Sequence, residues 1–422
     1  MGVKVAVAGG GSTYTPELVE GFVRRADRLP VDELVLLDID PERLEIVGGV
    51  AGRMLERAGY GARLHLSADA EEAVDGASFV IVQLRVGGQA ARLLDETIPP
   101  RFGCVGQETT GPGGFAKGLR TIPVVLDLAE LTARRGAPGA WIVDFTNPTG
   151  MVTQALLDEG HRALGLCNVA INLQRHFASR FGVEPERVEL EHVGLNHLSW
   201  ERAIRVDGID RLPELLGSSL DELAREADLP PELIAAIGAI PSYYLRYYYL
   251  MNEILEHQKS GPTRAEEVIE IETRLLEMYR DPALAEKPAL LERRGGAYYS
   301  EAAAQLVASL VAGTGDVQVL NVRNGGAIPN LADDDVVEVA ARVDRDGAHP
   351  IPVGPLSDDM LGLVEHAKAY ERLTIRAATS GDRALALKAL LSNPLVPDYP
   401  TASALLDAII DANREHLPRF GA

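Results

Sequence analysis

The sequence of 422 residues has few of the features of secreted, membrane-spanning or nucleic-acid-binding proteins. Its only cysteines are Cys104 and Cys167, which excludes a disulfide framework and favours a reducing compartment. No uninterrupted apolar run approaches the roughly 20 residues that cross a bilayer. The formal net charge of −21 would repel nucleic-acid phosphates. We therefore expect a cytoplasmic protein without a membrane or nucleic-acid partner, in which an anionic substrate would need a locally basic pocket.

The first 170 residues alternate short apolar segments with amphipathic ones. The apolar segments are rich in Val, Ile and Leu and cover residues 3–8, 33–38, 78–84, 140–145 and 163–167. The opening MGVKVAVAGGG fits a first strand better than a secretory signal. Helical patterns lie between the apolar segments, at residues 16–25, 41–58 and 115–135. Strands that are apolar on both faces and joined by helices are typical of a covered parallel sheet. The sequence therefore predicts a Rossmann-type, doubly wound α/β domain over residues 1–170.

The pattern changes after residue 172. Residues 189–207 are extended in pattern, residues 212–279 are mostly helical, and helical patterns return at 300–310 and 355–378. No internal repeat or low-complexity linker separates the two halves. We expect residues 171–422 to form a second, mixed α+β and largely helical lobe, with the active site between the lobes.

A glycine-rich turn follows the first predicted strand. In VAVAGGGSTYTPELV, Gly9 and Gly11 fit the first two glycines of the G-x-G-x-x-G pattern, and Tyr14 takes the third position. Small residues such as Ser12 and Thr13 let the backbone approach a pyrophosphate at the positive end of the next helix. This turn predicts a dinucleotide site.

The second predicted strand ends in LLDID, where Asp38 can accept a hydrogen bond from an adenosine ribose. The spacing from the glycines is longer than the usual ~20 residues, so Asp40 competes for this role. An acidic residue here would repel a 2′-phosphate, which favours NAD over NADP.

Four polar segments lie where strand ends or loops are expected. The first, QLRVGGQAARLLDETIPPRFGCVGQETTGPGG, contains seven glycines together with Arg92 and Glu108. It begins at the carboxyl edge of the predicted sheet, where ligands bind in open α/β folds. The second is FTNPTG, with Asn147 at a strand end; the third and fourth contain Cys167 and His197.

Cys167 and His197 make a poor structural zinc site, because such sites usually have four protein ligands. The pair would suit a catalytic metal whose other positions hold substrate oxygens and water. On spacing alone, the simpler interpretation is that Cys167 is a small core residue and His197 a hydrogen-bonded one.

Two further clusters lie in the second lobe. The segment AIPSYYLRYYYL holds five tyrosines within seven residues, which fits aromatic packing or a phenolate base near a positive charge. In LERRGGAYYSEAA, Arg293 and Arg294 precede a Gly-Gly turn and a helix. They can form a solvated helix start or an anion clamp.

Taken in order, these segments resemble the NAD- and metal-dependent glycoside hydrolases of family 4, from Lys4 to about Asn330. The matching parts are AGGGSTYTPELV, VGQETTGPGGFAKGLRTIP, FTNP, GLCNVAIN, GLNHL, the IP..YLR tyrosine segment, RRGGAYYSEAA and VRNGGAI. The resemblance implies a lactate or malate dehydrogenase-like fold, a homodimer or homotetramer, and a second lobe that carries substrate and metal sites and subunit contacts. It also implies hydrolysis by hydride transfer from C3 of the sugar to NAD, deprotonation at C2, elimination, water addition and return of the hydride.

The resemblance assigns roles to individual positions. It implies that Cys167 and His197 bind manganese or another divalent metal, against the simpler interpretation above. It implies that Tyr244 is the base, with Tyr243 in reserve, and that Glu108 helps the tyrosine to lose its proton. The implied substrate contacts are Arg92, Asn147, Asn168 and Arg294.

The residue after the metal-binding cysteine separates the subgroups of this family. Members that act on 6-phospho-α-glucosides read CDMP there, whereas 6-phospho-β-glucosidases read CNVPIN. This chain has Cys167-Asn168-Val169, with Ala170 in place of the proline. The resemblance therefore implies a 6-phospho-β-glucosidase that uses NAD and Mn²⁺. No acid adjoins the cysteine, so the proton donor to the aglycone is unassigned.

Three alternatives stay open on the sequence. The first is a family 4 enzyme that acts on an α-linked or unphosphorylated glycoside. The second is a 2-hydroxy-acid dehydrogenase, which shares the dinucleotide lobe but uses a His–Asp pair with arginines and no metal. The third is a nucleotide-sensing binding protein without catalysis.

Overall fold

The computed structural model describes residues 2–259, 261–295 and 298–421. Its centre is a nine-stranded sheet with the order β13-β12-β11-β6-β5-β4-β1-β2-β3. The parallel strands are β1 (Val3–Ala8), β2 (Val31–Leu37), β3 (Arg63–Ser67), β4 (Phe79–Val82), β5 (Trp141–Asp144) and β6 (Ala163–Gly165). Their spatial order, 3-2-1-4-5-6, is that of a dinucleotide-binding Rossmann sheet, which confirms the predicted fold class.

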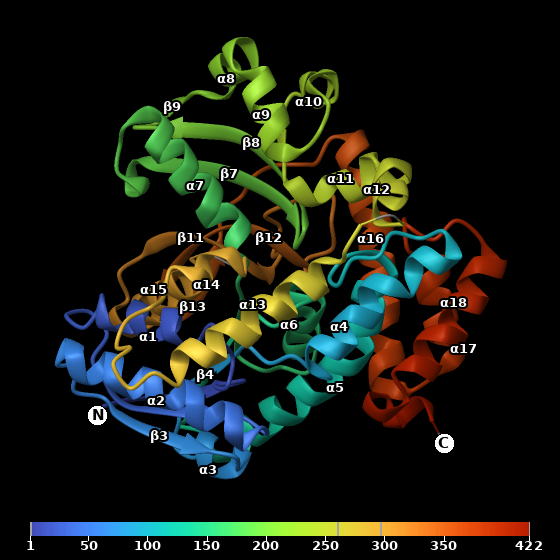
Figure 1. Cartoon of the computed structure of the whole chain (residues 1–422). Coiled ribbons are helices and arrows are strands. Elements are labelled where there is room, and N and C mark those ends of the chain that lie inside the picture. Colours follow the sequence, from blue (N-terminus) through green and yellow to red (C-terminus); the bar gives the residue numbers. More distant parts are fainter. Residues whose placement is uncertain (1, 260, 296–297, 422) are drawn as a thin grey trace.

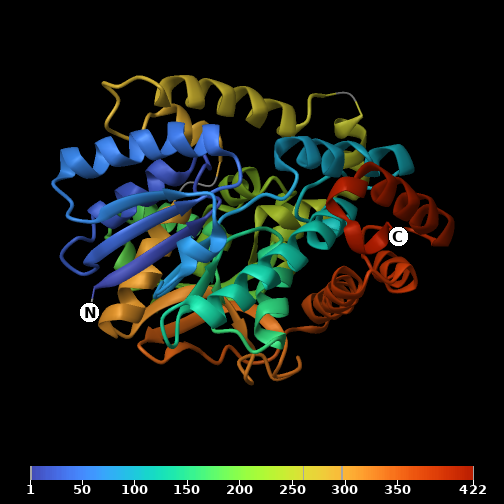
Figure 2. The ribbon, with the colours of Figure 1, turned by 90° about the horizontal axis from the view of Figure 1, so that it is seen from below.

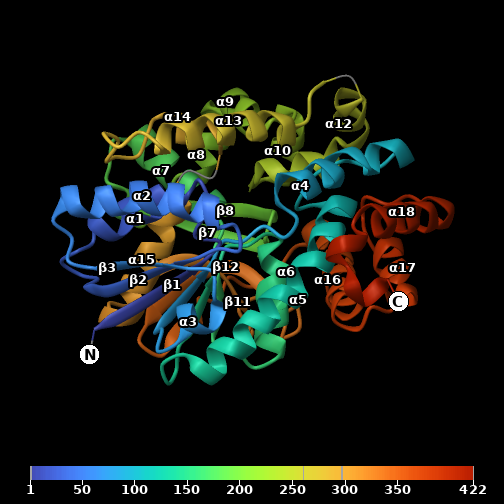
Figure 3. The ribbon, with the colours of Figure 1, turned by 60° about the horizontal axis from the view of Figure 1, so that its bottom comes forward.

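Helices cover both faces of this sheet (Figure 3). On one face lie α1 (Thr15–Val23), α2 (Pro41–Ala58) and α15 (Tyr299–Ala312), and on the other lie α3 (Ala70–Val74), α5 (Gly111–Arg135) and α6 (Thr149–Asp158). Each face has its own buried core of Val, Ile, Leu and Ala side chains. Burial on both faces explains why the strands could be recognised as continuous apolar runs.

Four strands of this sheet were not predicted. The edge strand β3 was missed because its side chains are mostly exposed, so the sequence shows no apolar run there. The others are β11 (Asp316–Arg323), β12 (Val336–Asp344) and β13 (Gly347–Pro350), which extend the sheet antiparallel beyond β6. The sheet thus continues past residue 170 into the second half of the chain.

The predicted extended region at 189–207 forms the hairpin of β7 (Val188–Leu195) and β8 (Leu198–Val206). The short strand β10 (Ile240–Pro241) pairs with β8, and β7 packs against β12 (Figure 1). Helices α7 (Asn168–Phe181), α8 (Leu212–Ser218), α9 (Leu220–Ala227) and α10 (Pro231–Ile237) surround this small sheet. It stands over the carboxyl edge of the main sheet, where ligands bind in this fold.

The remaining helices close the sides of the molecule. Helix α13 (Arg264–Tyr279) crosses α2 and α4 (Gly88–Thr97), and α16 (Asp358–Ser380) packs along α5 (Figure 2). Helices α17 (Arg383–Leu391) and α18 (Tyr399–Ala412) follow α16. Within the described residues, no helix combines the length and apolar character that a membrane span requires.

Candidate active site

The glycine-rich turn between β1 and α1 is tightly packed. Gly9 has a φ of +86°, and a Cβ atom there would lie 2.8 Å from the Gln83 carbonyl oxygen. A Cβ atom on Gly10 would lie 2.7 Å from that of Leu36. Only glycine fits both positions, because it alone has no Cβ atom to clash with these neighbours and adopts a positive φ without strain. The turn therefore has the close backbone approach that a pyrophosphate site needs.

Asp38 and Asp40 have different partners. The Asp38 carboxylate accepts a hydrogen bond of 2.8 Å from the amide of Gly11, so it lies at the glycine-rich turn. The Asp40 carboxylate accepts the amide of Arg43 at 3.0 Å and caps α2. Because capping occupies Asp40, the geometry favours Asp38 as the ribose ligand.

Helix α13 holds the far side of this turn through Glu272. The buried Glu272 carboxylate accepts hydrogen bonds from Gln89 at 2.9 Å, Thr13 at 3.5 Å and Arg294 at 2.9 Å. The hydroxyl oxygen of Ser12, the residue before Thr13, accepts a hydrogen bond of 3.2 Å from the backbone amide of Tyr14. The Thr13 hydroxyl is therefore directed at α13. Arg294, predicted to bind substrate, lies at this turn.

Arg294 also stacks on the ring of Tyr14, with its guanidinium carbon 4.2 Å from the ring centroid. Burial alone would raise the pKa of Glu272, but the charges of Arg294 and Arg43 outweigh it and lower that pKa to about 2. Glu272 is therefore ionised at neutral pH and holds Arg294 and the turn together.

This ion pair predicts an acid-dependent loss of stability. Because the folded-state pKa of Glu272 lies below the ordinary 4.5, the pairing stabilises the protein above pH 4.5 and is lost as the pH falls toward 2. We expect Glu272→Gln to lower the free energy of unfolding by about 3 kcal/mol near pH 6, and by progressively less toward pH 2. Denaturant unfolding of both proteins at several pH values measures this difference.

Glu267→Gln is the matched control, since Glu267 lies on the same helix and forms an exposed pair with Arg264. Its effect should stay small at every pH. A Glu272→Gln difference that does not change between pH 6 and pH 3 would contradict the prediction.

Three cations surround the Glu108 carboxylate at the carboxyl edge of β4. Arg85 bonds to it directly, Lys117 Nζ donates at 2.6 Å, and an Arg92 nitrogen lies 3.3 Å away. Burial alone would raise the pKa of Glu108, but these charges hold it well below its usual range. Burial, with repulsion from Arg85, lowers the pKa of Lys117 to about 7. The cluster is a locally basic region in a strongly acidic chain.

Arg85 and Lys117 had been given no role from the sequence. Both lie in segments that the sequence analysis quoted, QLRVGG and GGFAKGLR. Arg85 is 23 residues from Glu108 along the sequence, and Lys117 is 9 residues from it. These separations do not predict contact, because contact requires the loop before α5 to fold back on the end of β4.

His197 lies in the two-residue turn of the β7–β8 hairpin, with a φ of +63°. Its Nδ1 shares a hydrogen bond of 2.8 Å with the Thr109 hydroxyl. Its Nε2 is buried and has no hydrogen-bond partner among the described residues. Burial lowers the pKa of His197 to about 4, so the imidazole is neutral at neutral pH. A neutral imidazole with one nitrogen oriented by a hydroxyl and the other available is suited to metal binding.

Tyr244 lies directly against His197. The two rings are stacked, with centroids 3.7 Å apart and planes 13° from parallel. The segment is held there because β10 pairs with β8, and the Ser242 amide donates to the Ser199 carbonyl at 2.9 Å. Burial alone would lower the pKa of Arg92, but Glu108, Glu96 and, to a lesser extent, Tyr244 outweigh it and raise that pKa. Because His197 is also hydrogen-bonded to Thr109, the residue after Glu108, Tyr244 lies near the Glu108 cluster.

Cys167 approaches the same place from the other side. It is buried and directly precedes α7. The Cys167 side chain interacts electrostatically with Tyr243, whose ring centroid lies 4.2 Å from that of Tyr244. The structure thus places Cys167 and His197 around one tyrosine pair. A thiolate and an imidazole fit a divalent ion.

No group of three or more His, Cys, Asp and Glu side chains that could hold a metal is found in the described part of the chain. A metal on Cys167 and His197 would therefore keep positions for substrate oxygens and water, as catalytic metals do. Asn147 follows β5, and its buried Oδ1 has no hydrogen-bond partner within the described ranges. Asn168 is the first residue of α7, next to Cys167.

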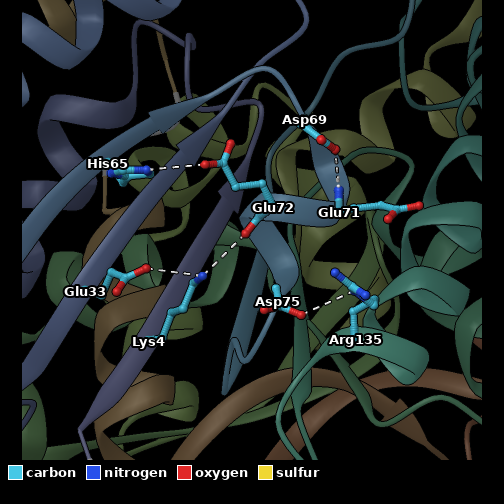
Figure 4. Close-up of a pocket in the computed structure, with 8 residues that line it drawn as sticks. All are labelled: Lys4, Glu33, His65, Asp69, Glu71, Glu72, Asp75 and Arg135. Carbon is cyan, nitrogen blue, oxygen red and sulfur yellow. Dashed lines mark hydrogen bonds and ion pairs between the residues drawn. The ribbon is translucent and has the colours of Figure 1, made fainter.

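A surface hollow of about 470 Å³ lies over β1, β2, β3 and α3, away from these residues (Figure 4). Its charged groups pair with one another. Lys4 is 3.2 Å from Glu33, and His65 is 3.5 Å from Glu72. It carries no group aimed at a ligand, and we assign it no function.

A glycine-rich dinucleotide turn, a Rossmann sheet and a Cys–His pair at a tyrosine define the chain as a Rossmann-type enzyme. Comparison with known proteins identifies its family. The model described as "Family 4 glycosyl hydrolase" matches residues 4–183, and that of the C-terminal domain of this family matches residues 192–396. The chain belongs to glycosyl hydrolase family 4, which confirms the resemblance.

Several relatives match almost the whole chain. A "Probable 6-phospho-beta-glucosidase" of Bacillus subtilis is 44% identical over 99% of this chain and 98% of its own. The 6-phospho-beta-glucosidase BglT of Thermotoga maritima is 39% identical over 98% of this chain and 99% of its own. A structure of the 6-phospho-beta glucosidase from Thermotoga maritima with manganese, NAD+ and glucose-6-phosphate has a TM-score of 0.93 at 38% identity, covering 98% of this chain and 99% of that one.

A malate dehydrogenase from Plasmodium falciparum, at 15% identity and a TM-score of 0.52, shares the fold alone and covers 89% of this chain and 98% of that one. This likeness confirms the expected dehydrogenase-like architecture.

Proposed function

We propose that the protein hydrolyses 6-phospho-β-glucosides and uses NAD and a divalent metal ion, with Mn²⁺ the first candidate. The observation that carries this proposal is the meeting of Cys167, His197 and Tyr244 beside the basic cluster at Glu108. Support comes from the relatives named 6-phospho-β-glucosidases, which are 38–44% identical over nearly the full chain. The maltose-6′-phosphate glucosidase of Bacillus subtilis is 28% identical, which disfavours an α-linked substrate.

The residues have distinct roles in this proposal. The turn of Gly9, Gly11, Ser12 and Thr13 and the Asp38 carboxylate would hold NAD, and Cys167 and His197 would hold the metal. Bound NAD and metal would supply the hydride acceptor for C3 and the polarisation of the neighbouring sugar oxygens.

Tyr244 takes the C2 proton, and the positive charge of Arg92 favours the phenolate form that accepts it. Glu108 keeps Arg92, Arg85 and Lys117 in place. Its low pKa makes it a weak base, so it helps the tyrosine indirectly, by holding these cations beside it. Asn147 and Asn168 are placed to bind sugar hydroxyls, and Arg294 contacts substrate from the dinucleotide turn.

We also propose roles for the two halves of the chain, an oligomeric state and a cellular location. Residues 1–170 would bind NAD, and residues 171–422 would carry the metal, substrate and subunit contacts. A role in carbohydrate metabolism in the cytoplasm is consistent with a phosphorylated substrate and two buried cysteines. The homodimer or homotetramer rests on the family resemblance.

The test is a panel of p-nitrophenyl glycosides with added NAD and Mn²⁺. We expect the 6-phospho-β-glucoside to be hydrolysed at least about 100-fold more efficiently, in kcat/KM, than the plain β-glucoside, because two or more charge-assisted hydrogen bonds to the phosphate would be lost. The 6-phospho-α-glucoside and a reaction without NAD are the controls. Equal rates with and without the 6-phosphate would reject the substrate, and activity unaffected by removing NAD and metal would reject the chemistry.

A further inference from the structure

A buried carboxylate, Glu338 of β12, connects the two segments that carry the candidate metal ligands. Its Oε1 accepts hydrogen bonds from Asn321 Nδ2 at 3.0 Å and from Asn196 Nδ2 at 3.3 Å. Its Oε2 lies 3.2 Å from His192 Nε2. Glu338, Asn321 and His192 are each 1% exposed or less. A carboxylate that is this deeply buried with three nitrogen partners rigidly fixes their positions.

The partners of Glu338 lead to both metal-binding segments. Asn196 directly precedes His197 in the hairpin turn. Asn321 is the register partner of Glu338 across β11 and β12, and of Gly165 across β11 and β6. Gly165 is the last residue of β6, two positions before Cys167. A single carboxylate thus links the strand end before Cys167 to the turn that carries His197.

The hairpin itself is anchored by the third partner. His192 of β7 lies between two carboxylates, with Nδ1 2.6 Å from Glu201 of β8 and Nε2 toward Glu338. His192 and Glu201 are register partners in the hairpin. Both strands of the hairpin are therefore tied to β12 of the main sheet.

The space around these contacts leaves little room for adjustment. A Cβ atom on Gly165 would lie 2.8 Å from the Asn321 Cβ and 2.2 Å from the Thr153 hydroxyl oxygen. A Cβ atom on Gly150 would lie 3.1 Å from the Asn196 Cβ. Asn321 and Asn196 are thus held by packing as well as by Glu338, so a change at Glu338 is transmitted to both segments.

We propose that Glu338 is a positioning residue that sets the distance and orientation between Cys167 and His197. This inference rests on the metal pair of the proposed function. Metal–ligand distances tolerate only about ±0.2 Å, so a two-residue site built from segments thirty residues apart depends on the groups that fix those segments. Replacing a residue that orients a metal ligand through hydrogen bonds commonly lowers metal affinity by about 10–100-fold.

The experiment compares Mn²⁺ and NAD binding by the full-length protein. Mn²⁺ affinity is measured from the electron paramagnetic resonance signal of the unbound ion, and NAD affinity by calorimetry. We expect Glu338→Gln, which keeps the side-chain shape, to weaken Mn²⁺ binding about 10–100-fold and to change NAD affinity less than about 2-fold, because Asp38 and the glycine-rich turn are remote from it.

Asp335→Asn is the matched control. Asp335 is a buried carboxylate next to β12 that pairs with Arg372, and within the described ranges its side chain forms no hydrogen bond or ion pair with the hairpin or with β6. It should lower the melting temperature without weakening Mn²⁺ binding. Asn196→Ala, which removes only the bond from the turn, serves if Glu338→Gln does not fold, and should also weaken Mn²⁺ binding.

The outcomes distinguish the two proposals. Wild-type protein that binds no Mn²⁺ would overturn both the metal site and the role of Glu338. Mn²⁺ binding by wild-type protein that is unchanged in Glu338→Gln or, where that variant does not fold, in Asn196→Ala would overturn the role of Glu338 alone. Equal losses of Mn²⁺ affinity in Asp335→Asn and Glu338→Gln would show a general effect of stability and would also overturn it.

Discussion

Replacing Cys167 by serine is expected to weaken Mn²⁺ binding more than about 100-fold. Replacing a residue that merely orients a ligand already lowers metal affinity by about 10–100-fold, and this change removes a ligand itself. Serine keeps the size of the side chain, but its hydroxyl is not ionised at neutral pH and so offers no anionic donor. Turnover of the 6-phospho-β-glucoside should fall by about 10³-fold or more, since a metal contributes several kcal/mol of charge stabilisation. Mn²⁺ titration and kcat at saturating NAD measure the two effects.

The second cysteine provides the control. Cys104 is buried in the core on the face of the sheet that α5 covers, and burial raises the pKa of its thiol to about 11. Cys104→Ser should cost about 1–3 kcal/mol of unfolding free energy, as the burial of a hydroxyl does, and leave Mn²⁺ affinity unchanged. If Cys167→Ser binds Mn²⁺ as tightly as Cys104→Ser does, Cys167 is a core residue, as its spacing alone suggested.

Replacing Tyr244 by phenylalanine is expected to lower kcat by about 10²–10⁴-fold, the usual contribution of a positioned base. The phenylalanine ring keeps the stacking on His197 and removes only the hydroxyl. NAD and Mn²⁺ affinities should therefore stay within a few-fold of the wild-type values. Steady-state kinetics with saturating NAD and Mn²⁺, together with binding measurements, separate the two effects.

Tyr243→Phe is the matched control for this prediction. The Tyr243 ring lies 4.2 Å from that of Tyr244, but Tyr243 is 42% exposed, whereas the Tyr244 ring is the one that stacks on His197. We expect Tyr243→Phe to affect kcat much less than Tyr244→Phe. A larger loss in Tyr243→Phe would assign the base to Tyr243.

The Glu108 cluster illustrates where prediction from the sequence stopped. The motif GQET marked Glu108, and the resemblance gave it a part in the deprotonation of the tyrosine. The structure surrounds it with Arg85, Arg92 and Lys117, which hold it ionised. The partners of a side chain depend on how a loop folds over a strand end, which short-range patterns do not encode.

The strands of the main sheet also divide into those that the sequence predicts and those that only long-range pairing determines. The sequence predicted β1, β2, β4, β5 and β6, because strands buried on both faces appear as uninterrupted apolar runs. It missed β3, an exposed edge strand, and β11 to β13, which join the sheet only after the chain has passed through the hairpin lobe. Their place beside β6 is set by long-range pairing, for which no local signal exists.

By itself, the sequence determined the Rossmann class, the glycine-rich turn and the segments that hold Cys167, His197 and Tyr244, because backbone conformation and burial impose local patterns. The tertiary structure alone decided that these segments meet around Tyr244. It also decided that Asp40 caps a helix while Asp38 faces the turn, and that Glu338 ties the hairpin to the sheet. Such contacts arise from the packing of distant segments, where the free energy of burial selects one arrangement among many that local patterns allow.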